Sequence, residues 1–385
     1  MSDWKKILGR VAIRAEHHFD TLKNALDQRL GSYQDVQIVP YLGFGNGKSL
    51  YLKGRVLKNH RIAAPRDRDS AWRNLLDAYR RFETDELPGV QVELQWNDSL
   101  HITATDDEGF FTFELEYVSA VPPAQAGFRH TAPLRLITQL TPEPVTATAE
   151  ILVPPADARF GIISDIDDTV LVSDATHLLR MAKLAFLHSF RTRLPFEGVS
   201  KFYQALQQGT GKDVFNPIFY VSSSPWNLYS LLTDFFSLQQ IPVGPLMLKD
   251  LGISRTHGVG TPHLAHKLAQ IERIMQMYPQ LPFIFLGDSG QRDPEIYAQA
   301  ARDYPGRVLA AYIRDVSGDQ RDAAVQAIIT GLAAINVEML LVPDTETAAR
   351  HAVAQGWVAS QAPAEIKRAE TQLPAPDSDW EEIIK

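Results

Sequence analysis

The most constraining feature of this 385-residue sequence is a series of short apolar segments that alternate with helical stretches from Arg159 onward. Strands separated by helices form a parallel sheet with helices on its faces. We therefore predict an α/β domain over residues 156–358, with one strand at each apolar segment. The six predicted strands are 159–164, 217–222, 244–248, 282–287, 307–313 and 338–342.

Residues 35–155 follow a different pattern, in which apolar and polar residues alternate. This period of two is typical of strands with one buried face, and several such strands in a short segment predict a β-sandwich accessory domain. We expect a helix at 70–86 and a hairpin-like turn at Asp106-Asp107-Glu108-Gly109. No catalytic cluster occurs here, so we expect a structural or binding role. The alternating sets are Leu50, Leu52 and Val56; Val90, Val92 and Leu94; Phe111, Phe113, Leu115 and Tyr117; and Val145, Ala147, Ala149 and Ile151.

The two ends of the chain differ from both segments. Within residues 1–34, apolar residues recur three and four apart over 3–30 and basic residues fall mainly outside that stripe, which predicts an amphipathic helix. This helix either packs on its own protein or a dimer partner, or lies on an anionic membrane surface. Prolines and an excess of acidic residues over 359–385 predict an acidic, flexible tail.

Composition narrows the compartment and the partners. A net charge of −8 and a pI near 5.8 oppose bulk attraction to nucleic acid. The absence of cysteine excludes disulfides, thiolate metal sites and a cysteine nucleophile. No apolar run approaches the ~18–20 residues of a membrane-spanning helix, and the first residues lack the apolar core of a signal peptide. We expect a cytoplasmic protein, at most peripheral to the membrane, and make no prediction of its oligomeric state.

The sequence Asp165-Ile166-Asp167-Asp168-Thr169 follows the first predicted strand of the α/β domain. Open α/β sheets bind ligands at the carboxyl ends of their strands. Residues two apart in extended chain lean to the same side, so Asp165 and Asp167 can share a metal ion or a phosphate. One carboxylate would attack phosphorus and the other would protonate the leaving oxygen. The alternative is an acidic turn without a catalytic role.

Three other stretches carry polar groups to the same edge of the predicted sheet. Ser222 and Ser223 follow the second strand, where hydroxyl and backbone N–H groups can hold a phosphate. Lys267 lies on a predicted helix and matters only if the fold directs it at the acidic cluster. Asp288, in Gly287-Asp288-Ser289-Gly290, follows the fourth strand. Carboxylate ligands without cysteines or paired histidines favour Mg²⁺.

The order of these motifs resembles the haloacid dehalogenase superfamily. In detail, the stretches Asp165–Thr169, Tyr220–Trp226, His266-Lys267 and Gly287–Tyr297 are similar to the phosphatidate phosphatase family first known from yeast cortical actin patches, whose catalytic domain is related to that of the lipins. This resemblance covers about residues 157–350. It implies a Rossmann-like catalytic domain of the haloacid dehalogenase type.

The resemblance also implies a role for each matching residue. Asp165 is expected to be the nucleophile that forms an aspartyl-phosphate, and Asp167 the general acid and then the base. Mg²⁺ would be held by Asp165, the Asp167 backbone carbonyl and Asp288, with Asp293 supporting the site. The phosphate-binding residues would be Ser222, Ser223 and Lys267.

The implied activity is Mg²⁺-dependent hydrolysis of phosphatidic acid or a similar lipid phosphate monoester. The gaps after Thr169 and Ser224 are too short for a large cap domain, which favours an open site. The basic, apolar segment 177–194 would rest on anionic lipid or only attract phosphate substrates. Two alternatives stay open: a general phosphomonoesterase acting on a non-lipid substrate, and a non-catalytic phosphatidate-sensing module.

Overall fold

The computed structural model describes residues 36–58, 87–116, 128–138, 143–166, 196–211, 214–249, 263–316 and 319–371. Several predictions lie outside these residues: the helices at 3–30 and 70–86, the basic segment 177–194 and the placement of Asp167. Among the described helices, none is both long and apolar enough to cross a bilayer.

The second half of the chain forms the predicted parallel sheet. Its six strands run in the order β11-β10-β9-β12-β13-β14, and every neighbouring pair is parallel. The chain starts in the middle at β9, adds β10 and β11 on one side, and then adds the other three strands on the opposite side, which places a topological switch point beside β9. All six strand predictions are confirmed to within a few residues. The strands are β9 (Gly161–Asp165), β10 (Ile218–Pro225), β11 (Leu246–Lys249), β12 (Phe283–Asp288), β13 (Val308–Arg314) and β14 (Glu338–Val342).

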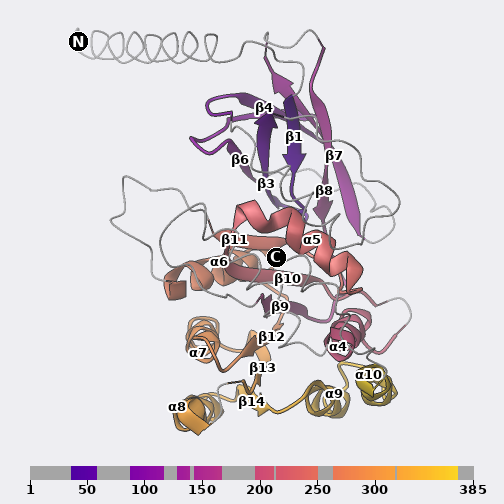
Figure 1. The fold of residues 1–385 in the computed structure, drawn as a ribbon, viewed down its shortest axis with the longest axis vertical. Helices are drawn as coiled ribbons and strands as arrows, with labels where there is room; N and C mark the ends of the chain where they lie inside the picture. Colours follow the sequence, from indigo (N-terminus) through magenta and orange to yellow (C-terminus); the bar gives the residue numbers. More distant parts are fainter. Residues whose placement is uncertain are drawn as a thin grey trace, which may run out of the picture.

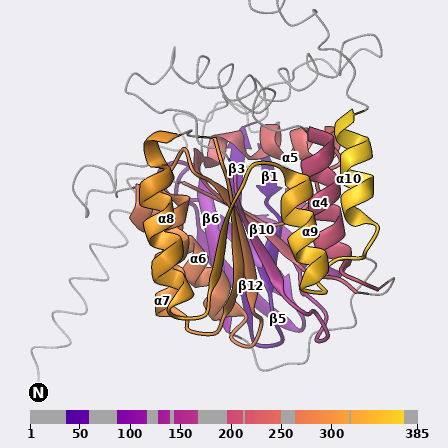
Figure 2. The same ribbon diagram turned by 90° about the horizontal axis from the view of Figure 1, so that it is seen from below.

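Helices cover both faces of this sheet (Figures 1 and 2). On one face lie α4 (Phe196–Gln208), α5 (Tyr229–Leu238), α9 (Thr345–Ala354) and α10 (Ala362–Thr371), and on the other lie α6 (His263–Met277), α7 (Asp293–Asp303) and α8 (Asp319–Ala333). The continuous apolar character of the strands follows from this layering, because successive side chains enter opposite cores. In β10, for example, Ile218 and Tyr220 pack into one core while Phe219 and Val221 pack into the other.

Residues 359–371 correct the predicted flexible tail. Ala362, Ile366 and Ala369 recur at helical spacing and are buried on one side of α10, which packs against α4. The acidic and proline residues between them hid this apolar stripe in the sequence. Any acidic tail therefore begins after Thr371, outside the described residues.

The N-terminal segment is a mixed sheet of eight strands. Its order is β1-β3-β2-β8-β7-β4-β5, with β6 paired to β3. Among the described strands of this N-terminal sheet, only β2 and β8 pair in parallel. The strands are β1 (Val36–Pro40), β2 (Gly43–Gly45), β3 (Ser49–Lys58), β4 (Gln91–Trp96), β5 (Ser99–Ala104), β6 (Phe110–Glu116), β7 (Arg129–Ile137) and β8 (Thr146–Leu152).

The turn at Asp106–Gly109 exists, but it does not close a hairpin. Asp106 Oδ1 accepts hydrogen bonds from the backbone N–H groups of Glu108 and Phe110, and Gly109 has a φ of +75°. The flanking strands pair elsewhere, β5 with β4 and β6 with β3. A local turn signal predicts a change of chain direction without identifying the partner of each strand.

The two parts of the molecule pack against each other through β3 and the loop before β2 (Figure 1). Between its first and last residues β3 is buried, because one face enters the core of the N-terminal sheet and the other faces the α/β domain. The Tyr41 ring stacks on Trp226 with a centroid distance of 5.0 Å. The Leu42 backbone N–H donates to the Tyr229 hydroxyl at 2.7 Å.

Candidate active site

The ends of β9, β10 and β12 bring the predicted site residues to one edge of the sheet. Asp165 is the last residue of β9, and its partner in β10 is Val221. Ser222 is therefore the next residue along the neighbouring strand. Asp288 ends β12, which lies on the other side of β9.

Lys267 on α6 points at this edge. Its Nζ lies 2.6 Å from Asp165 Oδ1 and 3.1 Å from Asp293 Oδ1. The same ammonium group donates to Gln291 Oε1 at 3.2 Å. The Lys267 side chain is only 5% exposed, so these charges interact with little screening by water. A helix-borne lysine, which is usually solvated, is here the positive centre of an acidic cluster.

Asp293, the first residue of α7, contacts both Lys267 and Asp288. Its carboxylate is fully buried, with Oδ1 accepting from Lys267 Nζ and Oδ2 accepting from the Asp288 backbone N–H at 3.1 Å. Pro294 in the first turn favours the start of the helix, whose N-terminal dipole also favours a carboxylate there. Gly287 permits this close approach, because a Cβ at that position would lie 2.6 Å from Asp293 Oδ2.

The loop after β12 holds Asp288 in place. Asp288 Oδ1 accepts a hydrogen bond from the Gln291 backbone N–H at 3.0 Å. Arg321 on α8 in turn donates to the Gln291 carbonyl and pairs with Glu295 at 2.6 Å. Gln291 thus touches Asp288 with its backbone and Lys267 with its side chain. The sequence did not reveal this role, because the glutamine in Gly-Asp-Ser-Gly-Gln becomes informative only once the loop is folded.

The three carboxylates suit a hard divalent cation. One oxygen from each of Asp165, Asp288 and Asp293 lies within 4.8 Å of the others. Asp165 Oδ2 is buried and has no hydrogen-bond partner among the described residues. Burial raises the pKa of Asp165 well above its usual range and the Asp293 charge adds to this, while Lys267 opposes it. A cation would supply the positive charge that this crowded site lacks, so the residues present fit a metal ion.

The predicted phosphate-binding serines are buried at the end of β10. Ser222 Oγ accepts from the Ser224 backbone N–H at 2.9 Å, which leaves its own proton available to donate. Ser223 Oγ is fully buried without a hydrogen-bond partner among the described residues. Both serines lie on the strand beside Asp165, and their part in phosphate binding stays a prediction.

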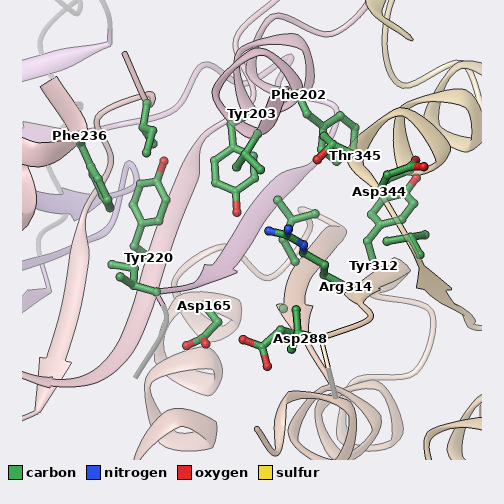
Figure 3. Close-up of a pocket in the computed structure, with 18 residues that line it drawn as sticks. Asp165, Phe202, Tyr203, Tyr220, Phe236, Asp288, Tyr312, Arg314, Asp344 and Thr345 are labelled. Atoms are coloured by element: carbon green, nitrogen blue, oxygen red, sulfur yellow. The ribbon is translucent and has the colours of Figure 1, made fainter. Parts of the chain in front are cut away.

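Two residues that lie near this edge of the sheet, Tyr203 and Arg314, were also not identified from the sequence. Tyr203 on α4 hydrogen-bonds Ser164 Oγ at 2.7 Å, directly before Asp165. Arg314 ends β13 and is the register partner of Asp288. Figure 3 shows Arg314 and Tyr203 in one pocket with Asp165 and Asp288. Neither residue belongs to a motif, and only the strand order brings them to the site.

Part of the α/β domain matches a known protein family. Residues 160–315 match the family model described as phosphatidate phosphatase APP1, catalytic domain. This segment is therefore similar to that catalytic domain. The resemblance predicted from the sequence is confirmed over these residues, which include the acidic cluster and Lys267. The predicted enzyme class, a phosphoric monoester hydrolase, is the class of this family.

Two curated relatives share part of the chain. Phosphatidate phosphatase APP1 of Saccharomyces cerevisiae is 33% identical over 163 residues, covering 42% of this chain and 27% of the relative. An uncharacterized protein of Schizosaccharomyces pombe is 27% identical over 241 residues, covering 62% of this chain and 37% of the relative. The chain therefore spans well under half the length of these relatives.

Among solved structures, a carbohydrate acetylesterase from Xanthomonas citri aligns with 85% of this chain and 71% of its own. The TM-score is 0.30 and the identity 9%. A likeness this weak carries no argument about fold or function.

Proposed function

We propose that this protein is an Mg²⁺-dependent phosphatidate phosphatase, which hydrolyses phosphatidic acid or a similar lipid phosphate monoester through an aspartyl-phosphate. The observation that carries the proposal is the contact of Lys267 with Asp165 at 2.6 Å, inside a group of three clustered carboxylates at the sheet edge. A single lysine against an isolated aspartate would be an ordinary ion pair. A lysine among three carboxylates, next to a serine-bearing strand end, is an arrangement suited to a phosphoryl group and a cation together.

In the proposed reaction Asp165 attacks phosphorus and the bond from phosphorus to the alcohol oxygen breaks. The departing oxygen takes a proton from Asp167, which lies outside the described residues. Water then attacks the aspartyl-phosphate and gives a proton back to Asp167, so that inorganic phosphate leaves and both aspartates return to their starting states. Covalent catalysis of this kind divides one difficult displacement into two easier ones.

The residues around Asp165 are proposed to bind the phosphoryl group and the metal ion. Lys267 holds the phosphoryl oxygens and offsets their charge, and Ser222 and Ser223 donate hydrogen bonds to them. Asp165 and Asp288, with the Asp167 carbonyl, would hold Mg²⁺, and Asp293 supports both Lys267 and Asp288 through the contacts above. When bound, the cation neutralises charge on the transferring group.

The proposal extends to the fold and to the location of the protein. We assign the parallel sheet to the haloacid dehalogenase type and the N-terminal mixed sheet to a β-sandwich. A cytoplasmic protein that touches membrane only peripherally would meet its lipid substrate at the surface, and residues 3–30 and 177–194 are the segments proposed for that contact.

The test is phosphate release from phosphatidic acid in mixed micelles, with Mg²⁺ or with EDTA. Wild type is compared with Asp165→Asn and with Asp107→Asn, a matched change at an exposed turn residue. We expect metal-dependent release that disappears in Asp165→Asn and persists in Asp107→Asn.

Parallel assays with p-nitrophenyl phosphate separate the alternatives. Turnover of this soluble ester without turnover of phosphatidic acid would keep the chemistry and reject the lipid substrate. Activity toward neither ester, from a folded protein, would reject catalysis and favour the phosphatidate-sensing module.

A further inference from the structure

An apolar hollow adjoins the acidic cluster on the α4 side of the sheet (Figure 3). It lies at the carboxyl ends of five strands and is closed by residues of α4, α5 and α9. Asp165 and Asp288 form one end of it. Its walls among the described residues include Tyr203, Tyr220, Tyr312, Arg314, Val316 and Asp344.

The hydroxyl groups of the tyrosines in this lining are hydrogen-bonded to protein groups. Tyr220 donates to the Pro242 carbonyl at 2.7 Å, and the Tyr312 hydroxyl is bonded to His351 Nδ1 at 2.9 Å. The Tyr203 hydroxyl is bonded to Ser164 Oγ. Because these polar groups already have protein partners, the hollow offers aromatic and aliphatic surface to a ligand.

Among the described residues, Asp344 and Arg314 are charged side chains that line the hollow outside the catalytic cluster. Asp344 caps α9, accepting a hydrogen bond from the Thr347 backbone N–H at 2.7 Å. Arg314 stands beside Asp288 in the sheet register, and Figure 3 shows its nitrogen atoms on the side of the hollow that faces Tyr203. The guanidinium group is thus at the junction between the acidic cluster and the apolar walls.

We propose that this hollow is the subsite for the alcohol side of the substrate, and that Arg314 is a specificity-determining residue that binds an ester or carbonyl oxygen close to the phosphate. The inference rests on the proposed function and deepens it. A guanidinium group offers several N–H donors in a fixed plane, which suits carbonyl oxygens, and the rings beyond it suit the first part of an apolar chain. The nitrophenyl group has no ester or carbonyl oxygen close to the phosphate, because its nitro oxygens lie on the far side of a rigid ring.

The first test measures binding without turnover. Dihexanoyl phosphatidate is titrated calorimetrically into full-length Asp165→Asn, and into the same protein carrying Arg314→Met or the exposed control change Arg302→Met. We expect the arginine at 314 to be worth about tenfold in Kd, the scale of a hydrogen bond to a charged group. Arg302→Met is expected to bind like its parent.

The second test compares kcat/KM for phosphatidate and p-nitrophenyl phosphate, with Asp165 intact. Arg314→Met should lose at least about fivefold more activity toward phosphatidate than toward the soluble ester. Val316→Phe should show the same selectivity, since Val316 is 38% exposed at the rim and a ring there narrows the entrance. Val316→Phe decides the question if Arg314→Met does not fold.

Equal losses for both esters would overturn the proposal, because Arg314 would then act on the phosphoryl group or the scaffold. An unchanged ratio of kcat/KM for phosphatidate and p-nitrophenyl phosphate in Val316→Phe would also overturn it. The proposed function can fail independently of the subsite. If phosphatidate binds in a way that depends on Arg314 but is not hydrolysed, the proposed activity is rejected and the subsite is kept. Hydrolysis that is indifferent to Arg314 keeps the activity and rejects the subsite.

Discussion

Gly287 is the residue on which the geometry of the acidic cluster depends most closely. A methyl group there would lie 2.6 Å from Asp293 Oδ2 and 2.8 Å from the Tyr297 ring. Tyr297 cannot move away easily, since it is buried and its hydroxyl donates to the Leu286 carbonyl at 2.7 Å. The Asp293 carboxylate would therefore have to shift, and its bonds to Lys267 and Asp288 would shift with it.

We accordingly predict that Gly287→Ala weakens the affinity for Mg²⁺ and so raises the Mg²⁺ concentration that activity requires. Residues that support metal ligands typically contribute 10–100-fold to metal affinity or activity, so the Mg²⁺ concentration for half-maximal phosphate release should rise about tenfold. The measurement is a Mg²⁺ titration of the initial rate. Gly331→Ala on α8 is the matched control, because a Cβ there meets nothing within 4 Å. A titration curve for Gly287→Ala that superimposes on wild type would show that Asp293 does not support the metal site.

At the scale of elements, α6 is fixed at both ends. Lys267 near its start reaches the acidic cluster, and Arg307, the residue before β13, binds backbone carbonyls at and beyond its end. Arg307 donates to the carbonyls of Met275, Tyr278 and Leu281, at 3.3, 2.6 and 2.7 Å for one of its nitrogens. Carbonyls at a helix C-terminus lack partners within the helix, and a guanidinium group satisfies several at once.

Replacing Arg307 by methionine should therefore reduce the free energy of unfolding by about 2 kcal/mol, because buried carbonyls lose a charged donor. Urea denaturation followed by circular dichroism measures this loss. The exposed Arg302→Met on α7 should change stability by less than about 0.5 kcal/mol. Equal stability of the two variants would mean that water replaces Arg307 at these carbonyls without cost.

The strands of the α/β domain show which features of the fold and of the site could be predicted from the sequence. The strands of the parallel sheet were predictable because most of them are buried on both faces, which leaves an apolar run with clear ends. The polar residues at those ends were predictable for the same reason. What the sequence could not supply is which polar groups meet: the contact of Lys267 with Asp165, and the placement of Arg314 beside Asp288, follow from strand order and helix orientation.

The predictions that failed have physical causes of the same kind. The turn at Asp106–Gly109 was read as a hairpin because turn chemistry is local, whereas strand pairing is not. The sequence indicated no role for Lys53 and Arg55 in β3, and both are buried, with their cations over the Phe110 ring at 4.9 and 4.6 Å. Long basic side chains bury their stems against aromatic surface when another domain covers the strand.

At the scale of the whole molecule, the face of β3 that contacts the α/β domain joins the two domains through a shared buried interface. Arg55 donates to Asn227 Oδ1 at 3.2 Å, and Tyr278 on the α/β side donates to the Gly45 carbonyl at 3.0 Å. Phe44 and Tyr51 belong to the same apolar core as Phe219. The N-terminal sheet also lies directly against the turn that follows Ser222–Pro225, so it supports the strand end that carries the predicted phosphate-binding serines.

Tyr41 is the residue that tests this coupling. Its ring stacks on Trp226 at 5.0 Å and lies 4.1 Å from the Tyr229 ring, so Tyr41→Ala removes these two of the aromatic contacts between the domains. Wild type should unfold in urea as a single transition, with circular dichroism and tryptophan fluorescence coincident. Tyr41→Ala should lower the urea midpoint and cost about 3 kcal/mol, as large-to-small core changes do. The transitions followed by circular dichroism and by fluorescence should then separate, because the domains lose their mutual support.

Tyr229→Phe, which removes only the hydroxyl that accepts from Leu42, is the control, and it should keep the two transitions coincident at a smaller cost in stability. If wild type itself unfolds in two well-separated steps, the domains are independent, and the N-terminal sheet cannot act as a support for the phosphate-binding edge.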